Sequence, residues 1–312
     1  MNKDKITSVK WFAQENLLLY IIITFFILFS FIGPGFFTLN NFLVILRSMS
    51  IVTVLGLGIT FVITAGEIDL SIGSVPAFSA AIFAILLEKN YPLLVGIIGA
   101  TVIATLIGFV NGKIVATTNL PSIIVTLATN MISSGFAYII THQAPIVVTN
   151  EIFIRLFGGN IFGFPIIVLW MLFLMLISYI ILHLTKIGRN LAFIGENRLA
   201  AYYAGIKVGD TLVLAFLISS IYSAIAGLLG VAQSFNAAPW MLSEYMMTAI
   251  AATIIGGTSF TGGKGNIIGV VLGAFFLTML SNGFLIIGIP QWVLYLINGI
   301  IIITALSWRY LH

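Results

Sequence analysis

Apolar segments of membrane-spanning length follow one another along nearly the whole chain, and they constrain its fold more than any other feature. A helix needs about 20 apolar residues to cross a bilayer. Only helices and closed barrels satisfy their backbone hydrogen bonds there, and the alternating polarity of barrel strands is absent. The sequence therefore predicts an all-α polytopic membrane protein with about ten transmembrane helices. We place them at 17–33, 43–64, 71–87, 92–112, 122–141, 165–185, 211–232, 245–257, 266–287 and 290–308.

The composition supports this class of protein. Hydrophobic residues make up 60% of the 312 residues and charged residues 7%, whereas soluble domains are about half apolar and a quarter charged. The chain has no cysteine, which excludes disulfides and thiolate metal sites. Its net charge of +4 is small and scattered, which argues against a nucleic-acid partner. We expect a single transmembrane domain over 1–312, surrounded by the lipid bilayer, that binds no metal and no cofactor itself.

The basic residues predict how the chain is oriented, because cytoplasmic loops are enriched in lysine and arginine. With ten helices and a cytoplasmic N-terminus, only Lys89 and Arg155 fall outside, and Arg47 lies within a helix. The other ten of the 13 basic residues fall inside: Lys3, Lys5, Lys10, Lys113, Lys186, Arg189, Arg198, Lys207, Lys264 and Arg309. Both termini are therefore expected in the cytoplasm.

The stretch ITAGEIDLSIGS, from Ile63 to Ser74, places two carboxylates between apolar flanks. A charged side chain at mid-bilayer costs at least about 2.5–3.5 kcal/mol, and on a regular helix Glu67 and Asp69 would point about 200° apart. Glycines flank both acids, so we expect at least one broken or re-entrant element here. Asp69 or Ser71 could cap the helix that follows. Glu67 could belong to a gate or pathway, or it could lie at the membrane interface.

Two glycine-containing patterns bear on the organisation of the chain. GATVIATLIGFVNGKIVATTNLP (Gly99–Pro121) echoes GAFFLTMLSNGFLIIGIP (Gly273–Pro290), since both run from Gly-Ala through a helix to Asn-Gly and a proline. An internal repeat and a chance match are both compatible with this echo. Five glycines in Gly256–Gly265 will not sustain a helix, so this segment is expected to be a flexible turn. A phosphate-binding loop is disfavoured there because neither Ser nor Thr follows Lys264.

Three stretches, taken together, are specific: GITFVITAGEIDLSIGSVPAFSA, GRNLAFIGENRLAAYYAGIKV (Gly188–Val208) and AIAATIIGGTSFTGGKGNIIGVVLGAFFLTMLSNGF (Ala249–Phe284). In the same order they resemble the GGIDLSVGS signature, the cytoplasmic loop and the glycine-rich block of permease subunits of ribose-type ABC importers. Those subunits carry monosaccharides and related small polar solutes. Glu67 and Glu196 stand where the usual pattern has glycine.

The resemblance implies several partners and a location. It implies a second permease subunit in a homodimer or heterodimer, ABC ATPase subunits that bind ATP and Mg²⁺, and an extracytoplasmic solute-binding protein, in a bacterial inner membrane. ATP-driven alternating access would move the solute inward, with no covalent chemistry by this chain. The segment 186–210 would be the cytoplasmic loop that lays a short helix into a groove of the ATPase. The candidate coupling residues are Gly188, Arg189, Glu196, Asn197, Ala200, Ala201 and Gly205.

Candidates for the solute pathway or gate are Glu67, Asp69, Ser71, Arg47, Trp240 and Trp292. The two tryptophans could stack on a sugar, or they could belong to the aromatic belt at the membrane interface. Arg47 could pair with Glu67 only through a broken or re-entrant segment, because 20 residues of unbroken helix span about 30 Å.

Two other classes of function would make different demands on the sequence. An ion-coupled secondary transporter would use Glu67 and Asp69 as its proton or Na⁺ site, but it does not require the long basic loop 186–210. An intramembrane enzyme would need a nucleophile–base pair or a metal set within the membrane. His183 stands alone in the sequence, and Ser133 and Ser134 have no basic residue near them.

Overall fold

The computed structural model describes residues 17–290, 292–294, 296–297, 299–300 and 303–304. Nine of the ten predicted segments coincide with helices of this described part. The predictions for Lys3, Lys5, Lys10, Arg309 and both termini lie outside the described residues, as does part of the segment 290–308.

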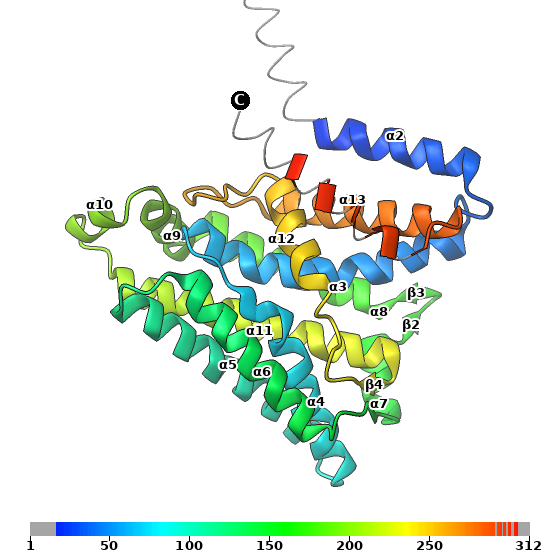
Figure 1. Ribbon diagram of the computed structural model, residues 1–312, viewed down its shortest axis with the longest axis horizontal. Coiled ribbons are helices and arrows are strands. Elements are labelled where there is room, and N and C mark those ends of the chain that lie inside the picture. The colour runs from blue at the N-terminus through cyan, green and yellow to red at the C-terminus, as the bar shows by residue number, and fades with distance from the viewer. Residues whose placement is uncertain (1–16, 291, 295, 298, 301–302, 305–312) are drawn as a thin grey trace, which may run out of the picture.

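The described chain is a bundle of apolar helices (Figure 1). The helices of the bundle are α2 (Leu17–Ile32), α3 (Leu39–Thr64), α4 (Val75–Glu88), α5 (Leu93–Thr117), α6 (Ser122–Ile140), α8 (Ile166–Tyr179), α11 (Val208–Ser234), α12 (Tyr245–Ile255) and α13 (Ile267–Ile286). A 3₁₀ turn, η1 (Leu70–Gly73), precedes α4, and a π-helical turn, η3 (Ile180–Leu184), extends α8. Within the described residues, six helices are long and apolar enough to cross a membrane, while α2, α4 and α12 are shorter, so the predicted count of ten is not confirmed.

The two ends of the bundle differ. One end carries two short helices, α9 (Lys186–Glu196) and α10 (Arg198–Tyr203), at the left of Figure 1. We call this the α9–α10 end. The opposite end carries α7 (Glu151–Phe153), the π-helical turn η2 (Ile154–Gly158) and two short antiparallel ladders. In these ladders β1 (Ile146–Val147) pairs with β4 (Asn236–Ala237), and β2 (Asn160–Ile161) pairs with β3 (Phe164–Pro165).

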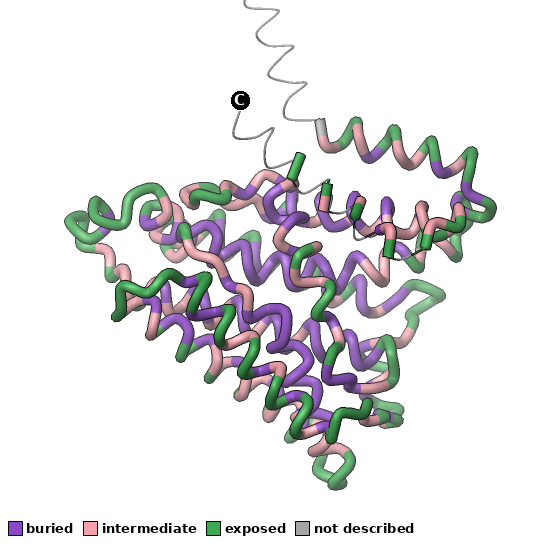
Figure 2. The backbone as a smooth tube through the Cα atoms, viewed as in Figure 1, coloured by how far each residue is buried: buried purple, intermediate pink, exposed green. Residues whose placement is uncertain are grey.

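Helices α3 and α11 form the centre of the bundle. Every residue of α3 from Met49 to Thr64 is buried, and the buried parts of the tube cluster around these two helices in Figure 2. At their crossing, a Cβ added to Gly58 of α3 would lie 2.8 Å from Cβ of Tyr222 on α11. In a membrane the hydrophobic effect does not drive helices together, and small residues favour association by letting the helix backbones approach closely. Buried α3 and α11 therefore serve as the scaffold on which the other helices pack.

The three helices that begin with α3 and the three that begin with α11 are arranged alike but run in opposite directions through the bundle. Helix α3 is followed by an irregular segment, the short α4 and the long α5, and α11 is followed by an irregular segment, the short α12 and the long α13. Helices α4 and α5 both pack on α11, whereas α12 and α13 both pack on α3. Helix α3 ends at the α9–α10 end and α11 begins there. This arrangement is the one expected of an inverted repeat, and the echo between Gly99–Pro121 and Gly273–Pro290 falls on the corresponding helices α5 and α13.

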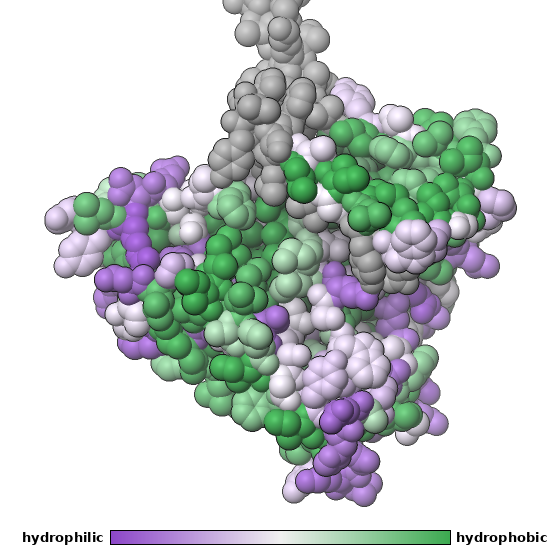
Figure 3. Space-filling view, in the orientation of Figure 1, coloured by the Kyte–Doolittle hydropathy of each residue, from purple (hydrophilic) through white to green (hydrophobic). Residues whose placement is uncertain are grey.

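On the face that Figure 3 shows, a broad band of apolar side chains lies between polar patches at the α9–α10 end and at the opposite end. On α5 and α6 the large exposed residues include Val102, Leu106, Phe109, Ile124, Met131, Ile132 and Ile139. Exposing so large an apolar surface to water would be unfavourable in free energy, whereas contact with lipid chains is not. This surface agrees with a protein that crosses a membrane several times.

The packing of α5 on α11 yields a test. The buried face of α5 repeats small residues every four positions, and a Cβ on Gly108 would lie 2.6 Å from the Phe216 carbonyl oxygen. We expect Gly108→Ala to lower the free energy of unfolding by about 1–3 kcal/mol through overpacking, although alanine favours helix by about 1 kcal/mol. Gly135→Ala on α6 is the matched control, because nothing lies within 4 Å of its added Cβ. Unfolding of both variants in detergent, followed by tryptophan fluorescence, measures the difference, and equal stability would contradict the packing argument.

Candidate functional site

The sequence between α3 and α4 breaks the helical path, as ITAGEIDLSIGS predicted. Helix α3 ends in a Schellman motif, in which the Gly66 amide donates to the Ile63 carbonyl (2.9 Å) and the Glu67 amide donates to the Val62 carbonyl (3.1 Å). Gly66 has φ +80°, which costs glycine little. The chain then runs irregularly into η1. We call residues 65–74 the α3–α4 break.

Hydroxyl groups of α6 satisfy the backbone of the α3–α4 break. The Ile68 amide donates to Ser122 Oγ (3.0 Å), and the Leu70 amide donates to Thr126 Oγ1 (3.0 Å). Thr126 Oγ1 also donates to the Ile68 carbonyl at 3.2 Å. Irregular backbone inside an apolar bundle is tolerated only where protein groups replace the missing hydrogen bonds. Ser122 and Thr126 are therefore the residues that make the break possible.

Asp69 lies at the centre of a buried polar network. Its Oδ1 accepts hydrogen bonds from the Ser71 amide (3.0 Å) and Ser71 Oγ (2.5 Å), and its Oδ2 accepts from Ser219 Oγ on α11 (2.7 Å). Asn111 Nδ2 on α5 donates to Ser71 Oγ (3.2 Å), and Thr129 Oγ1 on α6 donates to Asn111 Oδ1 (2.6 Å). Asp69 and Asn111 are fully buried. The network thus joins the break to three helices.

The predicted capping role is confirmed for Asp69, but on a different helix. Asp69 is the N-cap of η1, because its side chain accepts the Ser71 amide. Helix α4 itself begins after Ser74 without a side-chain cap and has a proline in its first turn. Ser71 lies inside η1, where its hydroxyl links Asp69 to Asn111.

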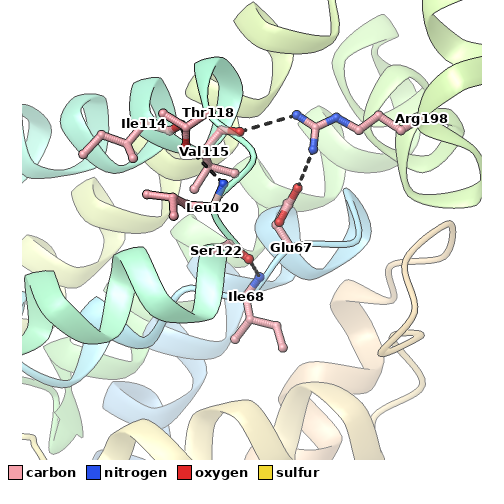
Figure 4. Close-up of polar contacts among 8 residues, drawn as sticks. All are labelled: Glu67, Ile68, Ile114, Val115, Thr118, Leu120, Ser122 and Arg198. Carbon is pink, nitrogen blue, oxygen red and sulfur yellow. Dashed lines mark hydrogen bonds and ion pairs between the residues drawn. The ribbon is translucent and has the colours of Figure 1, made fainter.

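Glu67 reaches out of the bundle toward α10 (Figure 4). Its Oε1 lies 3.1 Å from Nη1 of Arg198, the first residue of α10. Nη2 of Arg198 donates over 3.5 Å to the Val115 carbonyl, in the last turn of α5. Cations are favourable at a helix C-terminus, where carbonyl groups lack helical partners. Glu67 thus sits at the α9–α10 end and joins α10 to the break.

Helix α9 buries Leu191 and Ile194 in the core, and beside them its backbone approaches the backbone of the bundle closely. A Cβ at Gly195 would meet the Thr64 carbonyl oxygen and the Gly263 amide nitrogen, and a Cβ at Gly262 would lie 2.8 Å from the Cα atoms of both Gly195 and Gly66. The Gly263 amide donates to the Thr64 carbonyl at 3.0 Å. We call this meeting of the α3 terminus, α9 and the Gly256–Gly265 turn the glycine junction. The backbones lie so close together at Gly195 and Gly262 that a residue with a Cβ atom would clash there.

The outer face of α9 and α10 is available to a partner. Arg189, Glu196 and Asn197 are exposed, and Asn197 Oδ1 caps α10 by accepting the Ala200 amide at 2.9 Å. Large exposed side chains are Phe193, Leu199, Tyr202 and Tyr203. A cleft of about 890 Å³ lies beside them, lined by Ala116, Arg198, Leu199, Tyr202 and residues 205–210.

Not every candidate coupling residue lies on that outer face. Ala200 and Gly205 are exposed, but Ala201 is fully buried and packs inward. Gly188 is also buried, and a Cβ there would meet the backbone of Leu182. The small residues therefore divide between an outward and an inward role.

The remaining pathway candidates do not join Glu67 and Asp69. Arg47 lies on the unbroken α3, and its Nη2 donates to Asn160 Oδ1 (2.7 Å) in β2 at the opposite end. The pair with Glu67 therefore does not form. Trp240 is half-exposed between β4 and α12, with its ring centroid 6.5 Å from that of Tyr138. Trp292 is exposed.

Sequence reasoning missed several residues of the site. Arg198 counted only toward the orientation, although it pairs with Glu67 across 131 positions. Asn111 enters the sequence analysis only through the Asn-Gly echo, and no sequence pattern singles out Ser219, Ser122 or Thr126. A signal existed, since polar residues in apolar helices call for partners. Their partners in the α3–α4 break lie 40 to 150 positions away, so the spacing of residues in the sequence does not reveal them.

A helical bundle with six apolar helices of spanning length among its described residues, and a broken element braced by buried polar groups, defines a multi-pass membrane protein. Residues 41–306 match the family described as the permease component of a branched-chain amino acid transport system. The chain belongs to this family of permeases, which accords with the resemblance carried by the three motifs.

The chain is also similar to permeases with curated descriptions. It is 33% identical over 280 residues to the ribose import permease of Haemophilus influenzae, covering 88% of this chain and 87% of that protein. It is 33% identical over 282 residues to the ribose import permease of Bacillus subtilis, covering 89% and 87%. The D-allose transport system permease of Escherichia coli is 32% identical over 292 residues, covering 91% and 90%.

The Asp69 network yields a second test. In Asp69→Ala, the Ser71 amide and the Ser219 hydroxyl lose their acceptor, and each buried unsatisfied group costs about 1–3 kcal/mol. Asp69→Asn keeps an acceptor for Ser71, and its amide can donate to Ser219 Oγ. We therefore expect the free energy of unfolding in detergent to fall much more for Asp69→Ala than for Asp69→Asn. Asp210→Ala in the first turn of α11 is the control and should cost at most about 1 kcal/mol. Equal loss in the two Asp69 variants would refute the network.

Proposed function

We propose that this chain is the membrane-spanning subunit of an ABC importer that moves a monosaccharide or a related small polar solute into the cell by ATP-driven alternating access. The observation that carries the proposal is the amphipathic α9–α10 pair, which joins the bundle through the glycine junction and the Glu67–Arg198 contact and leaves an aromatic outer face free. The sugar permeases to which the chain is similar support the solute class.

The proposal includes an orientation in the bacterial inner membrane with ten helices and cytoplasmic termini. The basic residues support it. Lys113, Lys186, Arg189, Arg198, Lys207 and Lys264 all belong to segments that meet at the α9–α10 end. Lys89 and Arg155 lie toward the opposite end. By the positive-inside rule, the α9–α10 end is cytoplasmic.

The proposal also assigns partners. A second permease subunit completes the transport unit, an extracytoplasmic solute-binding protein delivers the solute, and ABC ATPase subunits bind ATP and Mg²⁺ and receive segment 186–210. Gly188 and Ala201 hold this segment to the bundle, while Arg189, Glu196, Asn197, Ala200 and Gly205 lie where the ATPase reaches them. Glu67, Asp69 and Ser71 would belong to the gate at the cytoplasmic end, and Arg47, Trp240 and Trp292 to the solute entry.

Uptake by the reconstituted complex tests the function. We expect proteoliposomes with this chain, its ATPase and its solute-binding protein to accumulate one member of a panel of radiolabelled pentoses and hexoses. Accumulation should require ATP and should survive a protonophore and a sodium ionophore. Uptake by the chain alone that collapses with the protonophore and ignores ATP would instead establish the ion-coupled transporter.

The outer face of α10 yields a separate test of ATPase docking. Tyr203 is 79% exposed, and aromatic side chains often dominate the free energy of association. We expect Tyr203→Ala to weaken co-purification of the ATPase by about tenfold, since hot-spot truncations cost 1–2 kcal/mol or more. Tyr91→Ala, exposed near the opposite end, is the matched control and should leave co-purification unchanged. Equal retention of the ATPase by both variants would place docking elsewhere.

A further inference from the structure

Arg198 connects α10 to the bundle. Helix α10 has six residues, packs on α9 and the start of α11, and buries Ala201 among residues that are otherwise exposed. Arg198 begins this helix, directly after its N-cap Asn197. Its guanidinium contacts Glu67 of the α3–α4 break and the last turn of α5. One side chain therefore connects α10 to two further elements (Figure 4).

Glu67 stands at the beginning of a connected set of hydrogen bonds. Its own amide closes the Schellman motif of α3, and the next amide, of Ile68, is held by Ser122 of α6. The carboxylate of Asp69, two residues after Glu67, accepts hydrogen bonds from the Ser71 amide and the Ser219 hydroxyl. A displacement of the Glu67 carboxylate therefore acts on a segment whose bonds reach α5, α6 and α11.

The ion pair is poorly suited to a purely stabilising role. The Arg198 side chain is 48% exposed and the Glu67 side chain 15%, and ion pairs near the surface contribute little to folding stability. Glycine at position 67, as in the pattern that this chain resembles, could not make the contact. The pair is thus a particular feature of this chain that joins α10 to the braced α3–α4 break.

We propose that the Glu67–Arg198 ion pair is the contact through which displacement of α10 reaches the α3–α4 break, so that both are positioning residues that couple ATP hydrolysis to transport. This inference rests on the proposed function, because the displacement of α10 comes from the ATPase. The pair makes its contribution to the coupling energy as a unit, so removal of either partner removes that whole contribution.

The test is a double-mutant cycle on the complete transporter in proteoliposomes. The variants are Glu67→Gln, Arg198→Gln and both together, and the readout is solute transported per ATP hydrolysed. Each single variant should lower this ratio between about 2- and 30-fold, the range that single coupling positions span, and the double variant should be no worse than either single one. Lys113→Gln, which removes an exposed cation from α5 at the same end, is the control and should keep the wild-type ratio.

A second measurement separates coupling from a merely structural role. Hydrogen exchange in residues 65–74 of the complete transporter should change on ATP binding in the wild type, and this response should vanish in Glu67→Gln although α10 still responds. A Glu67→Gln variant whose break responds like the wild type, single variants with unchanged ratios, or additive losses in the double variant would each overturn the inference. If the wild type itself takes up no solute with ATP, the proposed function fails, and the inference fails with it.

Discussion

The structure depends on how the backbone of the α3–α4 break is satisfied inside an apolar bundle. Each unpaired peptide group there would cost several kcal/mol, yet residues 65–74 leave the helical ladder. Ser122 and Thr126 of α6 supply the missing bonds, and Asp69 gathers Ser71 and Ser219 around one carboxylate. Because the partners come from α5, α6 and α11, the break fixes where these helices stand relative to α3. The need to satisfy these hydrogen bonds thus specifies how the helices pack, whereas apolar surfaces alone would allow several packing arrangements.

Two kinds of contact attach segment 186–210 to this framework. At the glycine junction, the backbones of Gly66, Gly195 and Gly262 meet without side chains between them. Such a contact transmits force as a rigid body, because no rotamer can absorb a shift. The Glu67–Arg198 contact joins two long side chains at partial exposure. Helix α9 is therefore attached to α3 through backbone, whereas α10 is attached to the break through a single ion pair.

Sequence reasoning located the helices and the break because apolar length and glycine flanks are local signals. It placed Asp69 correctly as a cap, but on the following helix rather than on η1, since a 3₁₀ turn of four residues has no periodicity to read. It also predicted that Arg47 and Glu67 would pair only if the helix between them were broken. Helix α3 is unbroken, and the pair does not form. It missed Arg198 as the partner of Glu67, because no local pattern links residues 131 positions apart. Helix α12 has 11 residues and is too short to cross a bilayer as a regular α-helix. The length of its apolar segment therefore does not predict whether this part of the chain crosses the membrane.

The inverted arrangement gives the bundle two irregular segments, and they are braced differently. The α3–α4 break lies at the α9–α10 end, and its bonds reach three other helices. Its counterpart between α11 and α12, residues 235–244, lies toward the opposite end, where the β1–β4 ladder holds its beginning and local turns such as Ser243 Oγ to the Trp240 carbonyl (2.9 Å) hold the rest. A force applied through α9 and α10 therefore meets a connected hydrogen-bond network at once. The opposite end is reached through the long helices that run between the two ends, among them α3, α5 and α11, so these helices link the two irregular segments.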